Sequence, residues 1–156
     1  MNSIDPMKRT LLKFIGLGTL AGCASAKAQG RSVSAIPINY TDRYIADVMI
    51  DGTWAGSANA YGGEGNRIEG FIAPTDPNKR VVLKVTWVVG SQYEVATNQY
   101  SRRPPEPREA NVELPVPHPA NPSYLILHFY PDGHVEAELS SDLPKRRIPR
   151  PTGYHR

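Results

Sequence analysis

Residues 124–139 read YLILHFYPDGHVEAEL and contain a complete β-hairpin pattern. Two runs of alternating apolar and polar residues flank Tyr130-Pro131-Asp132-Gly133, in which Pro suits the second position of a type I turn and Gly supplies the positive φ. A three-residue loop of this kind pairs Phe129 with Val135. This register gathers the apolar side chains on one face, and a slip of one residue would mix the two faces. The apolar face consists of Leu125, Leu127, Phe129, Val135, Ala137 and Leu139.

Residues 80–89 carry the strongest strand signal in the chain. Five apolar side chains recur there at every second position, which predicts a core-facing strand. The chain has 156 residues with 15 Pro and 13 Gly, and both residue types interrupt helices. That length suits one compact domain. The sequence therefore predicts an all-β fold, a single antiparallel β-sandwich-like domain.

Weaker patterns fill in the first half of this domain. Ser34–Tyr40 and Tyr44–Ile50 both alternate with period two around a short polar connection, so we expect them to form a hairpin. The Gly-rich run Ala55–Gly65 is expected to be a loop, and Ile68–Ala73 a short strand. The shared face of the second run is expected to be Tyr44, Ala46, Val48 and Ile50.

The segment Ser101–Pro122 is rich in proline, with seven of these residues. Proline cannot donate a backbone hydrogen bond, so this density excludes a central strand and predicts an extended loop or an edge segment. Val112–Leu114 is the part that we expect to pair with a neighbouring strand.

The first 22 residues are organised like an export signal. Lys8, Arg9 and Lys13 precede the apolar run FIGLGTL, which is too short to span a bilayer as a helix. The sequence Leu20-Ala21-Gly22-Cys23 follows and resembles the lipobox of bacterial lipoproteins, in which the sulfur of the Cys takes a diacylglyceryl group. The resemblance implies lipidation of Cys23, which is the single Cys of the chain, and anchoring of the mature protein in a membrane.

These features divide the chain into four parts. We expect a signal peptide at residues 1–22, a flexible tether at 23–34, the β-domain at 35–141 and a basic extended tail at 142–156. Ala24 follows the lipobox, at the position where an Asp retains enterobacterial lipoproteins in the inner membrane. We therefore expect an outer-membrane lipoprotein that faces the periplasm.

The net charge of +3 comes from the ends of the chain. Residues 23–141 hold 10 basic and 13 acidic residues, whereas residues 142–156 hold five basic residues and one Asp. A nucleic-acid-binding protein would carry its positive charge on the folded domain, beside stacking aromatics. We therefore expect no nucleic-acid partner. The basic tail is either solvated, bound to anionic lipid, or docked on an acidic partner.

Motifs for catalysis are absent from the sequence, so we expect no enzymatic activity and no cofactor. The predicted hairpin does place His128, His134 and Glu136 on one strand face, where two imidazoles and a carboxylate form a weak zinc candidate. The alternative is an ordinary solvent-facing sheet surface with cross-strand pairs.

Two loops carry residue types that are common at protein interfaces. Tyr61, Gly62 and Gly63 form a tight Gly-rich turn in which the backbone can approach a partner closely. Arg102 and Arg103 precede the proline-rich segment, and Arg and Tyr are enriched at binding hot spots. We expect these five residues to contribute to partner binding.

Several segments together resemble a known family of small proteobacterial lipoproteins of unknown function. Members are often encoded beside type VI secretion phospholipase effectors, and some act as immunity proteins against them. The resemblance implies that this chain binds and neutralises a secreted, lipase-type toxin as its protein partner. The segments that carry the resemblance are Asn39–Gly52, Tyr61–Gly63, Val81–Gly90, Val112–Pro115 and Leu125–Leu139.

Two other functions stay open at this point. A structural or assembly lipoprotein of the cell envelope would share the signal and the β-domain. A metal-dependent enzyme would use His128, His134 and Glu136.

Overall fold

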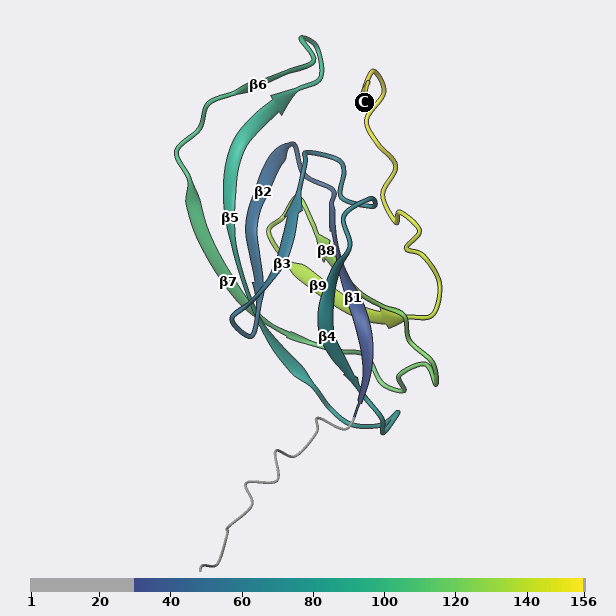
Figure 1. Ribbon diagram of the computed structural model, residues 1–156. Coiled ribbons are helices and arrows are strands. Elements are labelled where there is room, and N and C mark those ends of the chain that lie inside the picture. The colour runs from purple at the N-terminus through teal and green to yellow at the C-terminus, as the bar shows by residue number, and fades with distance from the viewer. Residues whose placement is uncertain (1–29, 156) are drawn as a thin grey trace, which may run out of the picture.

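The computed structural model describes residues 30–155, and the lipobox with Cys23 lies outside this range. These residues form two β-sheets packed face to face (Figure 1), which confirms the predicted all-β sandwich. The first sheet has the strand order β4 (Ile68–Pro74), β1 (Gly30–Asn39), β8 (Tyr124–Phe129), β9 (Val135–Ser140). The second sheet has the order β3 (Thr53–Ala58), β2 (Arg43–Ile50), β5 (Val82–Glu94), β6 (Gln99–Ser101), and β7 (Glu106–Glu113) also pairs with β5.

The β8–β9 hairpin has the predicted register, with Phe129 opposite Val135. The Gly133 amide donates a 3.0 Å hydrogen bond to the Tyr130 carbonyl, and Gly133 has a φ of 89°. The predicted apolar face of the hairpin belongs to the main core between the sheets. Strand β5 confirms the second strong signal and continues five residues beyond Val89.

The predicted hairpin of Ser34–Tyr40 with Tyr44–Ile50 is wrong, because β1 and β2 lie in different sheets. Strand β1 pairs parallel to β8, so the sandwich is not purely antiparallel. Residues on both faces of β1 are fully buried, as suits a central strand. The Asn39 side chain fixes the crossing between the sheets, because its amide donates to the carbonyls of Arg43 (2.6 Å) and Asn59 (3.0 Å).

A β-bulge in β2 overturns the predicted face of that strand. Asp47 has a φ of 46°, and the pairing registers of β2 shift around it. As a bulge changes which side chains point inward, Ile45 is buried with Val48 and Ile50, whereas Tyr44 and Ala46 are only half-buried.

The Gly-rich run predicted as a loop contains a strand, and the proline-rich segment, predicted as an extended loop or an edge segment, provides an edge strand. Thr53–Ala58 forms β3, in which the small side chains of Ala55 and Ala58 are fully buried. In the proline-rich segment, β7 pairs with β5 over eight residues, well beyond the expected Val112–Leu114. Strand β7 pairs only with β5, and an edge position of this kind tolerates proline. The predicted short strand at Ile68–Ala73 is confirmed as β4.

The boundaries of the domain also differ from those expected. Residues 30–34, assigned to the tether, form the start of β1, in which residues 30–33 pair with β4 and Ser34 pairs with β8. The tail at 142–155 has no regular strand and runs back along the domain, toward the upper end in Figure 1. Among the described residues, no helix is long and apolar enough to cross a bilayer.

Candidate functional site

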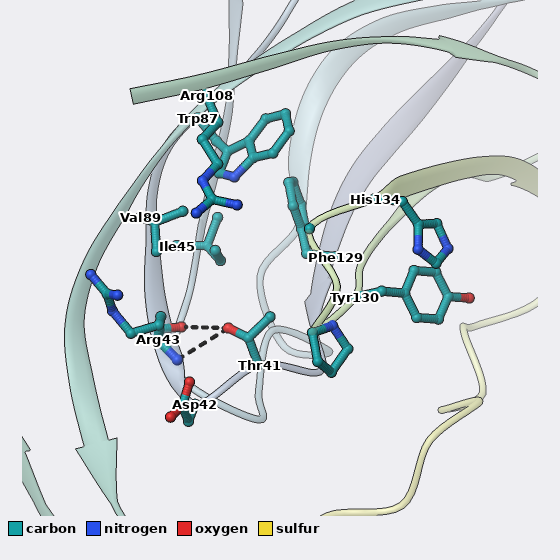
Figure 2. Close-up of a pocket in the computed structure, with 12 residues that line it drawn as sticks. Thr41, Asp42, Arg43, Ile45, Trp87, Val89, Arg108, Phe129, Tyr130 and His134 are labelled. Atoms are coloured by element: carbon teal, nitrogen blue, oxygen red, sulfur yellow. Dashed lines mark hydrogen bonds between the residues drawn. The ribbon is translucent and has the colours of Figure 1, made fainter. Parts of the chain in front are cut away.

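A cleft of about 210 Å³ opens at the end of the sandwich where β8 turns into β9. It lies between the two sheets, at the crossing from β1 to β2, the middle of β5, and the β8–β9 turn. The side chains around it come from segments far apart in the sequence (Figure 2). The lining residues are Thr41, Asp42, Arg43, Ile45, Trp87, Val89, Arg108, Phe129, Tyr130, Pro131, Gly133 and His134.

The floor of the cleft is aromatic and aliphatic. The rings of Trp87 and Phe129 meet edge to face, with their centroids 5.4 Å apart. Both side chains are buried, and Ile45 and Val89 complete the floor. Trp87 joins the second sheet to the first at this point, so the floor is part of the core and is held rigidly.

Two arginines that share one carboxylate stand at the rim. Arg43 and Arg108 bind the two oxygens of Glu106, at 3.2 and 3.0 Å. Hydrogen bonds from Arg108 and Arg43 lower the pKa of the Glu106 carboxyl, which keeps it ionised. In Figure 2 the Arg108 guanidinium points into the cleft, whereas that of Arg43 points away from it. A Cβ built on Gly133 would lie 3.0 Å from Nη1 of Arg108, so this side chain reaches from β7 to the β8–β9 turn.

The β8–β9 turn closes the opposite side of the cleft, and the side chains of Tyr130 and His134 point away from the cleft, where they form two stacked rings (Figure 2). Tyr130 and His134 lie 4.2 Å apart at an interplanar angle of 9°. Nδ1 of His134 is 2.5 Å from the Asp132 carboxylate. Hydrogen bonds from the backbone amide and the ring of His134 lower the pKa of Asp132.

The hydroxyl groups at the cleft are engaged within the fold. Thr41 Oγ1 donates to the Arg43 carbonyl and accepts from the Arg43 amide, both at 3.1 Å (Figure 2). The Tyr130 hydroxyl donates to Glu136 at 3.0 Å. The arrangement is therefore suited to holding an inserted group between aromatic and guanidinium surfaces.

The basic tail binds to its own domain. This differs from the three alternatives considered from the sequence, which were a solvated tail, a tail bound to anionic lipid and a tail docked on an acidic partner. Arg146 forms a 2.8 Å ion pair with Glu64, stands over the Tyr40 ring at 5.0 Å and is largely buried. Arg150 pairs with the same carboxylate at 3.1 Å. Burial opposes ionisation of Glu64, but the hydrogen bond and charge of Arg146 outweigh it, so its pKa is lowered.

Arg147 of the tail continues this network on the β8–β9 hairpin. Its guanidinium pairs with Glu138 at 2.9 Å and also contacts Glu136 and the Tyr130 hydroxyl. Its backbone amide donates to the Tyr40 hydroxyl at 3.2 Å. The tail thus covers the centre of the outer face of the β8–β9 hairpin. The sequence had predicted an exposed sheet surface or a zinc site there.

The three candidate zinc ligands do not converge. His128 is fully buried and both ring nitrogens have partners, the Tyr40 hydroxyl at 2.8 Å and Glu138 at 3.1 Å. Glu136 and His134 lie 3.6 Å apart on the exposed part of the hairpin. Within residues 30–155, no group of three or more His, Cys, Asp or Glu side chains is arranged to hold a metal ion.

The predicted Gly-rich contact loop is a packed structural turn. A Cβ on Gly63 would lie 1.9 Å from the Pro37 carbonyl oxygen, and Gly63 has a φ of 114°, so only glycine fits. The Gly62 carbonyl accepts a 2.8 Å hydrogen bond from the Asn39 amide. The Tyr61 ring packs edge to face on Tyr93 and Tyr154.

The predicted arginines lie outside the cleft. Arg102 and Arg103 are exposed in the connection from β6 to β7, and Arg103 donates to the Gln92 side chain at 3.0 Å. Sequence reasoning missed the two central residues of the cleft, Trp87 and Arg108. Arg108 gives no local signal, because its position depends on a pairing between β5 and β7 that the prolines obscure.

Comparison with known protein families identifies the family of this chain. Searches of curated proteins and of solved structures give no match. The profile of a family described as "Protein of unknown function (DUF3304)" matches residues 38–137, more than half of the chain. Every residue that lines the cleft falls within that match, and the tail does not. The chain is therefore a member of the DUF3304 family.

Proposed function

We propose that this chain is a lipoprotein of the outer membrane that faces the periplasm and neutralises a secreted, type VI lipase-type toxin by binding it. The sequence Leu20-Ala21-Gly22-Cys23 supports the anchor, and the resemblance described above supports the immunity role. In this proposal the protein acts by binding and not by catalysis.

The observation that carries the binding role is the cleft beside Trp87 and Arg108. Its volume of about 210 Å³ is below the ~300–1,000 Å³ of most small-molecule sites, so it suits a single side chain of a protein partner. Trp and Arg, two of the residue types that dominate binding hot spots, stand together at it as Trp87 and Arg108.

The rigidity of the cleft supports tight binding. Arg108 is held by Glu106, and Trp87 is held by its edge-to-face contact with Phe129 in the core. Side chains that are ordered before binding lose less entropy when a partner docks. The Arg108 guanidinium, which binds Glu106 through one nitrogen and points into the cleft, favours a partner that presents a carboxylate or an aromatic ring at the tip of a loop.

A protection assay tests this function. The product of the gene next to that of this chain, as the candidate effector, is directed to the periplasm, and growth is followed with and without the full chain. We expect the full chain to restore growth. Arg108→Ala should lose protection, whereas Arg80→Ala, which changes an exposed arginine outside the cleft, should keep it. Absence of protection by the unaltered chain would refute the proposal.

A separate measurement addresses the anchor. Labelling cells with radioactive palmitate should mark the full chain, and Cys23→Ser should abolish the label. If the chain gives no protection, but its deletion weakens the envelope in the absence of any toxin, the structural or assembly role replaces the immunity role.

A further inference from the structure

A second cavity lies at the other end of the sandwich, where the described chain begins at Gly30. Its volume is about 360 Å³, larger than the cleft and within the ~300–1,000 Å³ range of small-molecule sites. Gly30 pairs with Pro74 at the end of β4, and Pro74 lines this cavity (lower end of the sandwich in Figure 1).

The walls of this cavity are aliphatic. Val33, Leu83, Leu114 and Leu125 come from both sheets, are almost completely buried, and line it together with Leu139. No aromatic ring stands among the lining residues, in contrast with the cleft. Because this aliphatic lining opens to solvent, a ligand with a hydrocarbon chain would remove apolar surface from water there.

One charge stands at this cavity. Lys79 lines it from the loop between β4 and β5 and is exposed. Among residues 30–155, no carboxylate lies within ion-pair distance of its ammonium group. An ammonium without a partner, beside an aliphatic cavity, matches an anionic head group attached to a hydrocarbon chain.

The loop that carries Lys79 is anchored by a buried histidine. Nε2 of His118 donates to the Lys79 carbonyl at 2.8 Å, and the His118 amide donates to the Pro77 carbonyl at 2.7 Å. His118 is 5% exposed. The mouth of the cavity therefore has a fixed position relative to its walls.

We infer that this cavity binds a single-chain anionic lipid, with the acyl chain between the sheets and the head group at Lys79. A fatty acid and a lysophospholipid share this chemistry. The inference does not depend on toxin neutralisation, because it uses the opposite end of the domain.

Titration of palmitate into residues 24–156, which contain the whole described domain, tests the inference. Displacement of a fluorescent fatty acid, cis-parinaric acid, reports binding. We expect saturable binding of palmitate that is at least about tenfold tighter than that of octanoate, because more methylene groups are buried. Equal affinity for the two acids would overturn the inference, and so would the failure of both palmitate and the lysolipid described below to bind.

Two variants locate the site. Val81→Trp fills the cavity and should weaken palmitate binding at least about tenfold, by removing the volume that the chain occupies. Lys79→Glu changes an exposed side chain, so folding should be preserved. This variant should lower the affinity for palmitate severalfold and leave the affinity for the uncharged hexadecanol unchanged. Lys145→Glu, which changes an exposed lysine of the tail, is the matched control. Wild-type affinity for palmitate in both cavity variants would contradict the assignment.

A second series of titrations distinguishes a fatty acid from a lysophospholipid as the ligand. Lysophosphatidylglycerol with the same acyl chain is titrated in parallel with palmitate. Tighter binding of palmitate identifies a free carboxylate as the preferred head group, and tighter binding of the lysolipid identifies a glycerophosphate. Failure of both ligands to bind refutes the inference.

Discussion

The two ends of this sandwich are built in opposite ways. At the end of the β8–β9 turn, the space between the sheets is small and is surrounded by aromatic rings, arginines and ion pairs. At the end where β1 begins, the space is larger and aliphatic, with one exposed lysine. At the polar end, hydrogen bonds and ion pairs fix the positions of the side chains. At the apolar end, aliphatic side chains surround an open cavity. The comparison teaches that the two proposals, partner binding at the polar end and lipid binding at the apolar end, rest on separate residues of one β-sandwich, because the two spaces share no lining residue.

The largest difference between the polar and the apolar end should appear in the free energy of unfolding, when the Trp87 side chain at the polar end and a Leu side chain at the apolar end are truncated. Trp87 is 5% exposed and contacts Phe129, so we expect Trp87→Ala to lower the free energy of unfolding by about 3–5 kcal/mol. Leu114→Ala at the apolar end should cost about 2 kcal/mol, at the low end of the usual range, because the wall there already faces open space. Urea denaturation measures both values. Equal losses would remove the contrast between a packed end and a hollow one.

Backbone geometry near the polar end should give the next largest effect. Gly63→Ala brings a Cβ to 1.9 Å from the Pro37 carbonyl oxygen at a positive φ, which should cost about 3 kcal/mol. Gly65→Ala is the matched control, because a Cβ there meets nothing within 4 Å. Thermal unfolding of the two variants checks the prediction. A Gly63→Ala protein as stable as Gly65→Ala would show that this turn is not fixed by close packing.

The tail should contribute a smaller amount. Arg146→Ala removes the ion pair to Glu64 and the contact with Tyr40, so we expect a loss of about 2 kcal/mol in unfolding free energy. The neighbouring Lys145 is exposed and forms no ion pair within residues 30–155, so Lys145→Ala should change stability by no more than about 0.5 kcal/mol. The comparison uses the same denaturation assay. Equal behaviour of the two variants would mean that the tail is not docked in solution.

The smallest expected effect is a dependence on pH. Burial lowers the pKa of His128 below its usual value of about 6.5, although the hydrogen bond to Glu138 opposes the shift. Below that usual value the unfolded chain takes up a proton that the folded chain does not, so stability falls as pH decreases toward the folded-state pKa. The pKa values of Glu64 and Glu136 are lowered from 4.5, so these carboxyls titrate below this window. Melting temperatures measured from about pH 7 to 5 should fall in the wild type and stay flatter in His128→Gln. A slope that His128→Gln retains would contradict this assignment.

Local signals in the sequence predicted local structure well. The register of β8–β9 follows from four residues, Tyr130 to Gly133, and from the alternation on either side of them. The alternation at residues 80–89 likewise sufficed for β5. The crossing between β1 and β2 was not predictable in this way, because a period-two run does not reveal which sheet it joins. The burial of both faces of β1 in the structure shows that it is a central strand and not the first strand of a hairpin.

The candidate site was harder to predict than the fold. The cleft depends on Arg108 reaching the β8–β9 turn from β7, a contact between segments that the sequence does not link. In the Gly-rich turn at Tyr61–Gly63, close contact with Pro37 of β1 is enough to require Gly63, and the role of this turn in partner binding stays a prediction. The arginines of the tail were equally ambiguous, since only the fold brings Glu64, Glu136 and Glu138 within their reach.

The most direct test of the central claim is a calorimetric titration of residues 24–156 with the candidate effector, the product of the gene next to that of this chain. The account predicts nanomolar affinity, a loss of at least about tenfold in Arg108→Ala, and no loss in Arg80→Ala or Lys79→Glu. Absence of binding, or an affinity that Arg108→Ala leaves unchanged while Arg80→Ala or Lys79→Glu weakens it, would contradict the assignment of partner binding to the polar end.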